Sequence, residues 1–168
     1  VLVGYDDPRT SEYFVPAAKN GKYEGLRNGL TAGQMAEALN IPDANSNKGP
    51  RWKKPEGMET SSNVMCTAEA WFLKAEANML GWNVGGTAKS NYEEGIRQSM
   101  AQWGITDAAK ITAYVNSTKT PTAPGDFLNS PPLHNAPVAF GSTAAQQKLQ
   151  ISTQKWLALF RCALSGYD

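Results

Sequence analysis

The middle of the chain alternates apolar and polar residues at the spacing of an α-helix. After residue 64, apolar residues recur in steps of three and four, at Met65, Ala68, Phe72, Ala75 and Met79. This spacing places them on one face of a helix, which Leu73 and Leu80 would widen. Gly81 then marks the helix end. The pattern predicts a helix over about 65–80.

A second amphipathic helix follows after a short glycine-rich turn. The positions of its buried face are Tyr92, Ile96, Ser99 or Met100, and Trp103. Ser90 and Glu93 have the S-x-x-E spacing of a capping box, and Gly104 follows the last apolar position. Two amphipathic helices joined by a short turn predict an antiparallel helical hairpin, at about 65–80 and 87–103.

The segment before the hairpin is less regular. Residues 1–64 contain many proline and glycine residues, which interrupt helices. They leave room for one short helix over 32–39, with Thr31 and Gln34 as its capping box, and for a short strand near Tyr13–Val15.

Beyond the hairpin we expect a shorter helix over 107–115, begun by Thr106 and Asp107, and a long loop rich in Pro, Thr and Ser over 117–141. A last helix is expected over 143–160, capped by Thr143 and Gln146. Its apolar stripe would consist of Leu149, Thr153, Trp156 and Phe160.

These patterns predict a mainly α fold, with a helical hairpin plus a further packed helix and long irregular loops. The length of 168 residues fits one domain. We expect that domain to be loop-rich over 1–64, helical over 65–116, a loop over 117–141 and helical over 142–162.

Composition narrows the function. Lys and Arg total 16 and Asp and Glu total 15, for a net charge of +1, so the chain has no basic surface for nucleic acid or an anionic membrane. The hydrophobic fraction of 41% is enough for a core. No apolar run is long enough to span a membrane.

The residues that would carry catalysis or bind a metal are sparse. The chain has one histidine, His134, and two distant cysteines, Cys66 and Cys162, which excludes a zinc or CxxC motif. Glu69 and Glu76 are about 10.5 Å apart along a helix, too far for a glycosidase pair. We predict no catalytic residues, no metal and no cofactor. The cysteines are compatible with a disulfide or with two separate thiols, and we expect thiols.

The aromatic residues suggest binding instead. Of the five tryptophans, Trp71, Trp103 and Trp156 lie on expected helices, and the simplest interpretation is that they are core or helix-contact residues. Trp52 lies in the polar loop 45–57, and a loop Trp packed under a helix is the common alternative. An indole beside polar side chains suits a sugar ring. The candidate glycan-binding residues are Trp52 for stacking, Arg51 and Asn47 for the hydroxyls, and Tyr23 as a second stacking residue.

Several motifs together resemble the SusD/RagB family. The stretch 67–105 carries Glu69, Phe72-Leu73-Lys74-Ala75-Glu76-Ala77, Gly81-Trp82, Tyr92, Gly95-Ile96, Ser99-Met100 and Trp103-Gly104. Asp7-Pro8-Arg9, Lys22-Tyr23-Glu24-Gly25 and Thr153–Phe160 are similar to further family motifs, in the same order along the chain.

The resemblance implies a C-terminal part of a SusD-like domain, with its hairpin one of the family's tetratricopeptide-like helix pairs. It also implies a surface-exposed lipoprotein of the outer membrane of Bacteroidetes-type bacteria, whose lipid anchor lies outside this fragment. Such proteins bind oligo- or polysaccharides, have no catalytic activity and cover a TonB-dependent, SusC-like transporter. A fragment of this kind is expected to expose apolar helix faces.

Two functions follow. The first is a non-catalytic glycan-binding component of an outer-membrane nutrient-uptake complex. The alternative is a helical-repeat scaffold that docks on a protein partner and has no glycan site of its own.

Overall fold

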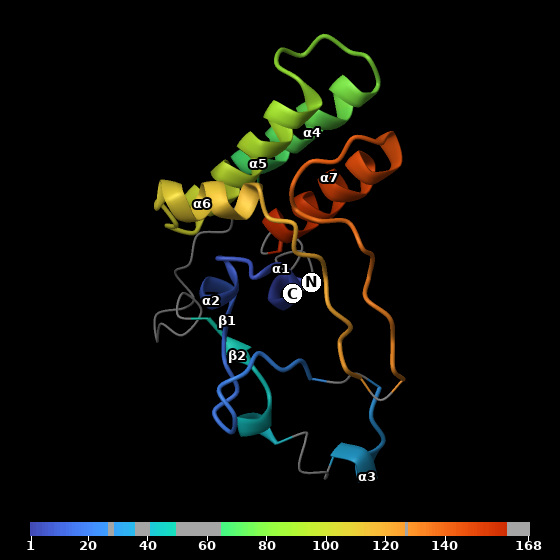
Figure 1. Ribbon diagram of the computed structural model, residues 1–168. Helices are drawn as coiled ribbons and strands as arrows, with labels where there is room; N and C mark the ends of the chain where they lie inside the picture. Colours follow the sequence, from blue (N-terminus) through green and yellow to red (C-terminus); the bar gives the residue numbers. More distant parts are fainter. Residues whose placement is uncertain (27–28, 36–40, 50–64, 127, 161–168) are drawn as a thin grey trace.

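The computed structural model describes residues 1–26, 29–35, 41–49, 65–126 and 128–160. Its helices are α1 (Leu2–Tyr5), α2 (Thr10–Tyr13), α3 (Ala32–Met35), a 3-10 helix (Pro42–Ala44), α4 (Thr67–Met79), α5 (Ala88–Gln102), α6 (Ala108–Val115) and α7 (Ala144–Ala158). Two short strands, β1 (Phe14–Val15) and β2 (Asn47–Lys48), pair antiparallel. The predicted mainly α fold is confirmed (Figure 1).

The predicted hairpin consists of α4 and α5, and both ends of its turn are set by local sequence. The N–H of Gly81 (φ 81°) donates to the carbonyl of Asn78, and that of Trp82 donates to Ala77, a Schellman ending. A capping box of Thr87 and Ser90 begins α5. The predicted box of Ser90 and Glu93 is therefore wrong by three residues, because Thr87 already offers the hydroxyl at the N-cap.

The hairpin helices approach closely where Phe72 faces Gly95. A Cβ atom at Gly95 would lie 2.7 Å from the Phe72 ring, so only glycine fits this contact. The predicted positions Ala68, Phe72 and Ala75 are buried. Three other predicted members of the face, Met65, Leu73 and Leu80, are exposed. The error has a geometric cause. Met65 and Leu80 lie outside α4, and Leu73 lies about 100° around the helix from Phe72, which contacts α5.

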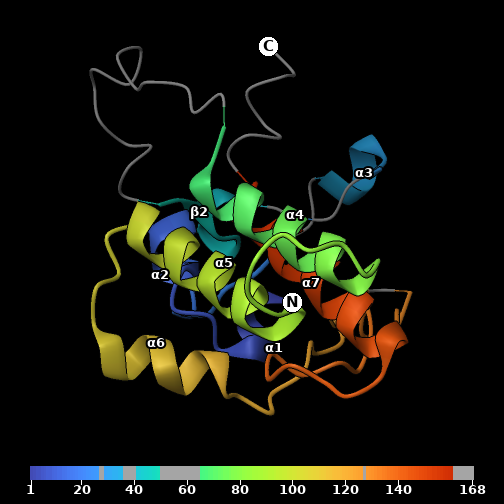
Figure 2. The ribbon, with the colours of Figure 1, turned by 90° about the horizontal axis from the view of Figure 1, so that it is seen from above.

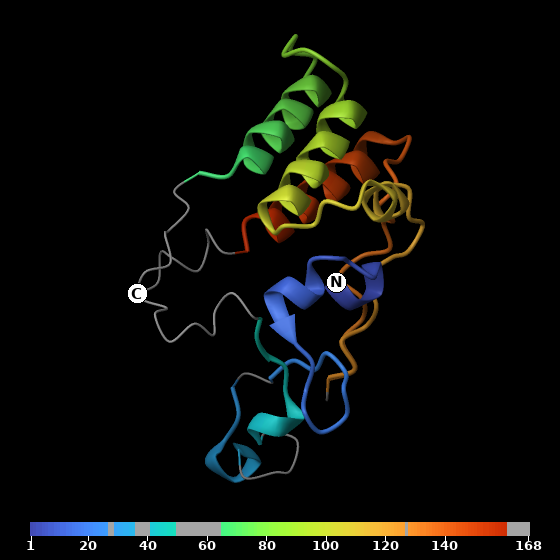
Figure 3. The ribbon, with the colours of Figure 1, turned by 90° about the vertical axis from the view of Figure 1, so that its left-hand side faces the viewer.

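Helix α7 packs beside α4 and runs antiparallel to it (Figures 1 and 3). The predicted stripe is only partly correct. Leu149 and Trp156 are exposed, whereas Thr153 is buried and the Phe160 ring stacks on Tyr13. The buried face consists of Gln150, Ile151, Thr153, Gln154, Leu157 and Ala158. Gln150 is accepted in the core because its amide donates to the carbonyls of Pro137 and Ala139, both at 2.8 Å, and its carbonyl accepts from Gly141 at 2.9 Å.

The N-terminal segment lies beneath the helices and is fastened by tyrosines (Figure 3). The hydroxyl of Tyr5 donates to the carbonyl of Ala136 at 3.0 Å, and that of Tyr13 donates to Leu157 at 2.9 Å. The Tyr13 ring also packs edge-on against Trp103, with centroids 4.5 Å apart. β1 confirms the strand expected near Tyr13–Val15.

The remaining elements lie at the edges of the molecule (Figure 2). Asp107 caps α6 by accepting from the N–H groups of Ala109 and Lys110. Thr31 and Gln34 make the expected capping bonds at α3, and residues 36–40 of that predicted helix lie outside the described part. The described parts of the predicted loop, 117–126 and 128–141, contain no helix or strand. No helix among the described residues is both long and apolar enough to cross a membrane.

Candidate functional site

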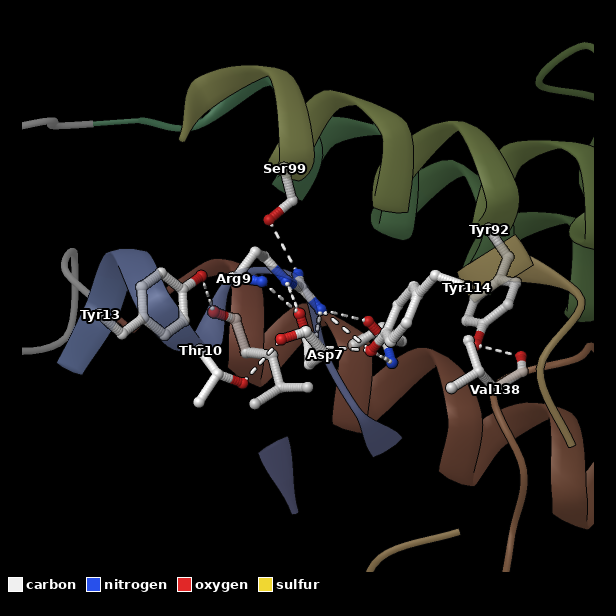
Figure 4. Close-up of polar contacts among 10 residues, drawn as sticks. Asp7, Arg9, Thr10, Tyr13, Tyr92, Ser99, Tyr114 and Val138 are labelled. Carbon is white, nitrogen blue, oxygen red and sulfur yellow. Dashed lines mark hydrogen bonds and ion pairs between the residues drawn. The ribbon is translucent and has the colours of Figure 1, made fainter. Parts of the chain in front are cut away.

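A buried ion pair lies at the meeting point of the N-terminal segment and the helices (Figure 4). Arg9 donates from Nη2 to Asp7 Oδ2 at 2.6 Å and from Nε to Asp7 Oδ1 at 2.9 Å. Both side chains are fully buried. The Asp-Pro-Arg turn folds the two onto each other, since the backbone N–H of Arg9 also donates to Asp7 Oδ1.

The pair is satisfied by a side chain from each of three helices. Arg9 donates to Ser99 Oγ of α5 at 2.9 Å and to Gln154 Oε1 of α7 at 2.8 Å. Tyr114 of α6 donates to Asp7 Oδ2 at 2.6 Å. Burial, reinforced by the charge of Asp7, holds the pKa of Tyr114 well above its ordinary value, so the phenol keeps its proton. This network joins the N-terminal segment to α5, α6 and α7. Its side chains are bonded to one another and therefore have a structural role rather than a role in binding a substrate.

A pocket of about 560 Å³ opens beside this network, between the N-terminal segment and α6. Its volume is that of a small-ligand site. The walls combine apolar and polar side chains, namely Leu2, Val3, Tyr5, Asp6, Asp7, Pro8, Thr10, Ser11, Tyr23, Lys110, Ala113, Tyr114, Ser117 and Lys119. Asp7 and Tyr114 are the members that it shares with the buried network.

Charged side chains border the pocket. Lys119 Nζ lies 2.8 Å from Asp6 Oδ2, and both side chains are largely exposed. This hydrogen bond, with the positive charges of Lys119 and Lys110, lowers the pKa of Asp6. The carboxylate and the two ammonium groups give the pocket hydrogen-bond acceptors and donors that water can reach.

The four predicted glycan-binding residues divide between this pocket and the rest of the chain. Tyr23 is partly buried and lines the pocket. Asn47 is exposed on β2, is not one of the lining residues, and accepts from the N–H of Lys48 at 2.7 Å. Arg51 and Trp52 lie outside the described residues, so their roles stay predictions.

The sequence did not indicate Asp6, Lys110 or Lys119 as site residues. Asp6 belongs to the N-terminal segment, whereas Lys110 lies on α6 and Lys119 shortly after it, and only the fold places them around one pocket. Asp6 directly precedes the Asp7-Pro8-Arg9 motif, but that motif did not mark it as a site residue, and no motif surrounds the two lysines. Among the lining residues, Tyr23 is the one that the sequence predicted as a binding residue, because of its aromatic ring.

The other tryptophans have mixed outcomes. Trp103 is buried, as predicted. Trp71 is partly buried on α4, with the Lys74 ammonium 4.2 Å from its ring centre. Trp156 is 58% exposed, so its prediction as a core or helix-contact residue is wrong: it lies on the side of α7 opposite the buried glutamines.

The residues considered for catalysis have structural partners. Glu76 forms an ion pair with Lys155, at 3.1 Å, that joins α4 to α7. His134 is partly buried and fastens the loop 128–141 to α7, with Nε2 2.9 Å from Thr153 Oγ1. Cys66 is buried, and Cys162 lies outside the described residues, so the thiol prediction is untested. No cluster of three or more His, Cys, Asp or Glu residues that could hold a metal is found in the described part.

Comparison with known proteins identifies the family. The family model of SusD-like proteins, described as Susd and RagB outer membrane lipoprotein, matches residues 1–166. None of the curated protein sequences compared with the chain matches it.

Solved structures agree with the family model. The chain is 32% identical to a chitin-binding SusD homologue from Flavobacterium johnsoniae, with a TM-score of 0.75 over 96% of this chain and 33% of that one. It is 30% identical to a SusD homologue from Bacteroides thetaiotaomicron, with a TM-score of 0.73 over 95% of this chain and 33% of that one. The chain thus spans about a third of the structures that it matches. It belongs to the SusD-like family.

Proposed function

We propose that this chain is part of a non-catalytic glycan-binding component of an outer-membrane nutrient-uptake complex. The observation that carries the proposal is the pocket of about 560 Å³ that Tyr23 lines, on a fold shared with a chitin-binding SusD homologue. In this proposal the ligand is an oligo- or polysaccharide.

The pocket has the two kinds of group that a sugar needs. The Tyr23 ring offers an apolar face to the C–H groups of a pyranose. Hydroxyls of Ser11 and Ser117, the ammonium group of Lys110 and the carboxylate of Asp6 are within the lining and suit the sugar hydroxyls. Trp52, Arg51 and Asn47 would extend the binding surface along the loop 45–57.

The absence of catalysis is part of the proposal. Asp7 lines the pocket, but its side chain is fully buried and both of its carboxylate oxygens are bonded to Arg9 or Tyr114. Asp6 is exposed and paired with Lys119. Neither arrangement resembles the pair of a general acid and a nucleophile that glycoside hydrolysis uses.

The place of action is also a proposal. The family is described as outer membrane lipoproteins, which supports a surface-exposed location on a bacterial outer membrane. A SusC-like TonB-dependent transporter would then be the protein partner, receiving the glycan.

Affinity electrophoresis across a polysaccharide panel, followed by calorimetry with chitooligosaccharides, tests the proposal. Tyr23→Ala and Trp52→Ala should each weaken binding roughly thirtyfold, for about 2 kcal/mol of lost ring contact. Trp82→Ala is the matched control, since Trp82 is 64% exposed and is not one of the residues that line the pocket. It belongs to the turn between α4 and α5, which Figure 1 shows at the top of the molecule, away from α1 and α2.

The possible results separate the two functions. Saccharide binding that depends on Tyr23 supports the glycan site in the pocket, and binding that depends on Trp52 alone moves it to the loop. Binding that neither substitution weakens would contradict both positions. If no saccharide binds, the alternative of a helical-repeat scaffold for a protein partner takes its place.

A further inference from the structure

The pocket beside the buried network has an excess of positive charge. Among the lining residues that the structure describes, the charged side chains are those of Asp6, Asp7, Lys110 and Lys119. The charge of Asp7 is compensated inside the fold by Arg9, and both of these side chains are fully buried. The accessible charges are therefore one carboxylate, that of Asp6, and two ammonium groups. One positive charge of the lining has no counter-charge.

Lys110 supplies a cation that no other side chain engages. It lines the pocket together with Ala113 and Tyr114, which lie three and four residues further along α6 and so on the same face of that helix. Asp6 pairs with Lys119, and within the described part of the chain the Lys110 ammonium group has no ion-pair or hydrogen-bond partner. Its charge reaches Asp6 only through space, where it helps to lower the pKa of that carboxyl.

Lys119 is placed at the pocket by a close approach of two backbone segments. A Cβ atom at Gly4 would overlap the backbone of Thr120 and Thr122, so the segment after Lys119 can lie against α1 only because residue 4 is glycine. The N–H of Lys119 also donates to Ser117 Oγ at 3.2 Å. The Lys119 side chain is 56% exposed, and exposed ion pairs add little stability, so its ammonium group can turn from Asp6 to a ligand at small cost.

A saccharide with a negative charge suits this lining better than a neutral or a cationic one. A neutral sugar would leave the charge of Lys110 without a counter-charge, and an amino sugar would meet an excess of positive charge. Hydrogen bonds from an ammonium group to an anion are also shorter and stronger than those to a hydroxyl. We propose that the pocket binds an acidic saccharide, whose carboxylate or sulfate group contacts Lys110 and Lys119 while a sugar ring packs on Tyr23, an assignment that rests on the proposed function and names its class of ligand.

Asp6 limits the strength of this preference. Its carboxylate lies 2.8 Å from the Lys119 ammonium group, competes with the ligand for that group and repels an incoming anion. Because its pKa is lowered, Asp6 is charged at neutral pH. Loss of the Asp6 charge should therefore strengthen the binding of an acidic saccharide, whereas loss of the Lys110 charge should weaken it. Changes of opposite sign at two residues of one pocket indicate an electrostatic effect and not a general disturbance of the fold.

Other charged ligands fit this pocket less well. A calcium ion takes six to eight oxygen ligands, and the lining has one accessible carboxylate next to two cations. A nucleic acid needs a broad basic surface, and the chain has a net charge of only +1. A single anionic group on a sugar requires no more than the two lysines provide.

Calorimetry on the complete polypeptide to which this chain belongs, with pairs of oligosaccharides that differ in charge, tests the proposal. One pair is oligogalacturonides and their methyl esters, and the other is sulfated galactan oligosaccharides and their desulfated forms. In at least one pair the charged member should bind about fivefold more tightly, as expected for one accessible ion pair. This affinity ratio should decrease as NaCl is raised from about 0.05 to 0.5 M, since salt screens accessible charges. The pair that shows the preference identifies the anionic group.

Three variants locate the charges that produce the ratio. Lys110→Gln should bring it close to one, because the charges of Lys119 and Asp6 then cancel. Asp6→Asn should raise it by about threefold, and asparagine tolerates the φ of 53° at this position as aspartate does. Lys148→Gln is the matched control. It removes the same charge from an exposed position of α7 that does not line the pocket, and it should leave the ratio unchanged.

The outcomes separate this proposal from the proposed function. If the charged and neutral members of both pairs bind equally well, selection by charge is wrong and glycan binding stands. If the ratio persists in Lys110→Gln, or falls equally in Lys148→Gln, the anion does not bind at this pocket and the proposal is also overturned. If no saccharide of either pair binds and the wider polysaccharide panel gives none, this proposal and the proposed function fail together.

Discussion

The hairpin and the N-terminal segment are held in place by different kinds of interaction. At the turn of the α4–α5 hairpin, both helix ends are fixed by residues within a few positions of them, namely Gly81 and the Thr87–Ser90 capping box. In residues 1–15, α1 and α2 have four residues each, too few to be stable alone. Their order depends on side chains that reach partners more than 90 residues away, as Tyr5 and Tyr13 do.

This difference shows what a single side chain can control. A cap in the hairpin stabilises one helix end, whereas Arg9 donates to Ser99 of α5, to Gln154 of α7 and to the phenol of Tyr114 on α6. We therefore expect large effects of substitution in the N-terminal segment and smaller ones at the hairpin's local signals.

The largest effect is expected from Arg9→Met. The substitution leaves Asp7 buried without its counter-charge, and such losses cost about 3–5 kcal/mol of the free energy of unfolding. Urea denaturation measures the change. Lys119→Met is the matched control, because it breaks an exposed ion pair with Asp6 that is worth about 0–1 kcal/mol. Equal losses in the two variants would contradict the special role of the buried pair.

The same contrast explains which parts of the fold the sequence predicted. The hairpin, α6 and the start of α7 follow from helical spacing and caps, which are local. The buried face of α7 could not be predicted in this way. Glutamine is usually a surface residue, yet Gln150 and Gln154 are buried because tertiary packing supplies their hydrogen-bond partners. Gln150 donates to a loop carbonyl, and Gln154 accepts from Arg9, which is distant in sequence. Trp156 shows the opposite error. Its apolar side chain favoured a core or helix-contact position, but the apolar character of a residue does not determine which neighbours surround it.

The candidate site was still harder to predict. Tyr23 stood out as an aromatic residue in a polar segment, and it lines the pocket. Lys110 and Lys119 have no such distinguishing context, and they join Asp6 only through tertiary packing. When a pocket is made of side chains from several segments, the sequence pattern of any one segment cannot predict it.

A smaller loss is expected from Gly95→Ala, inside the hairpin. The new Cβ atom would lie 2.7 Å from Phe72 Cε1, and overpacking of this kind costs about 1–3 kcal/mol. The better helix propensity of alanine offsets up to about 1 kcal/mol of that cost. Gly33→Ala in α3 is the control, because its Cβ would meet no atom within 4 Å. Chemical denaturation that finds both variants equally stable would rule out the close helix contact.

Removal of one local signal should have a still smaller effect. Thr87→Ala takes away the hydroxyl that accepts from the N–H of Ser90 at 3.1 Å, and loss of such a cap costs about 1 kcal/mol. Thr106→Ala is the control, since the neighbouring Asp107 caps α6. Thermal denaturation of both variants checks the assignment, and a larger loss in Thr106→Ala would show that the cap of α6 is wrong.

The smallest effect expected is a pH dependence from His134, the only histidine in the chain. Burial lowers its pKa below the usual value of 6.5, and Nδ1 accepts from the N–H of Ala136 at 3.2 Å, which requires the neutral ring. The unfolded chain therefore binds the proton more readily than the folded one. Stability from this residue is complete above pH 6.5 and is lost as the pH falls through the lowered pKa.

Thermal midpoints of the natural chain and of His134→Gln, compared between pH 7.5 and pH 5, isolate this contribution from that of the carboxylates. The natural chain should lose stability relative to the variant as the pH falls. A relative gain would mean that the folded state prefers the charged imidazolium. That result would require acceptors at both ring nitrogens, and so would contradict the donation from Ala136 that joins this loop to its histidine.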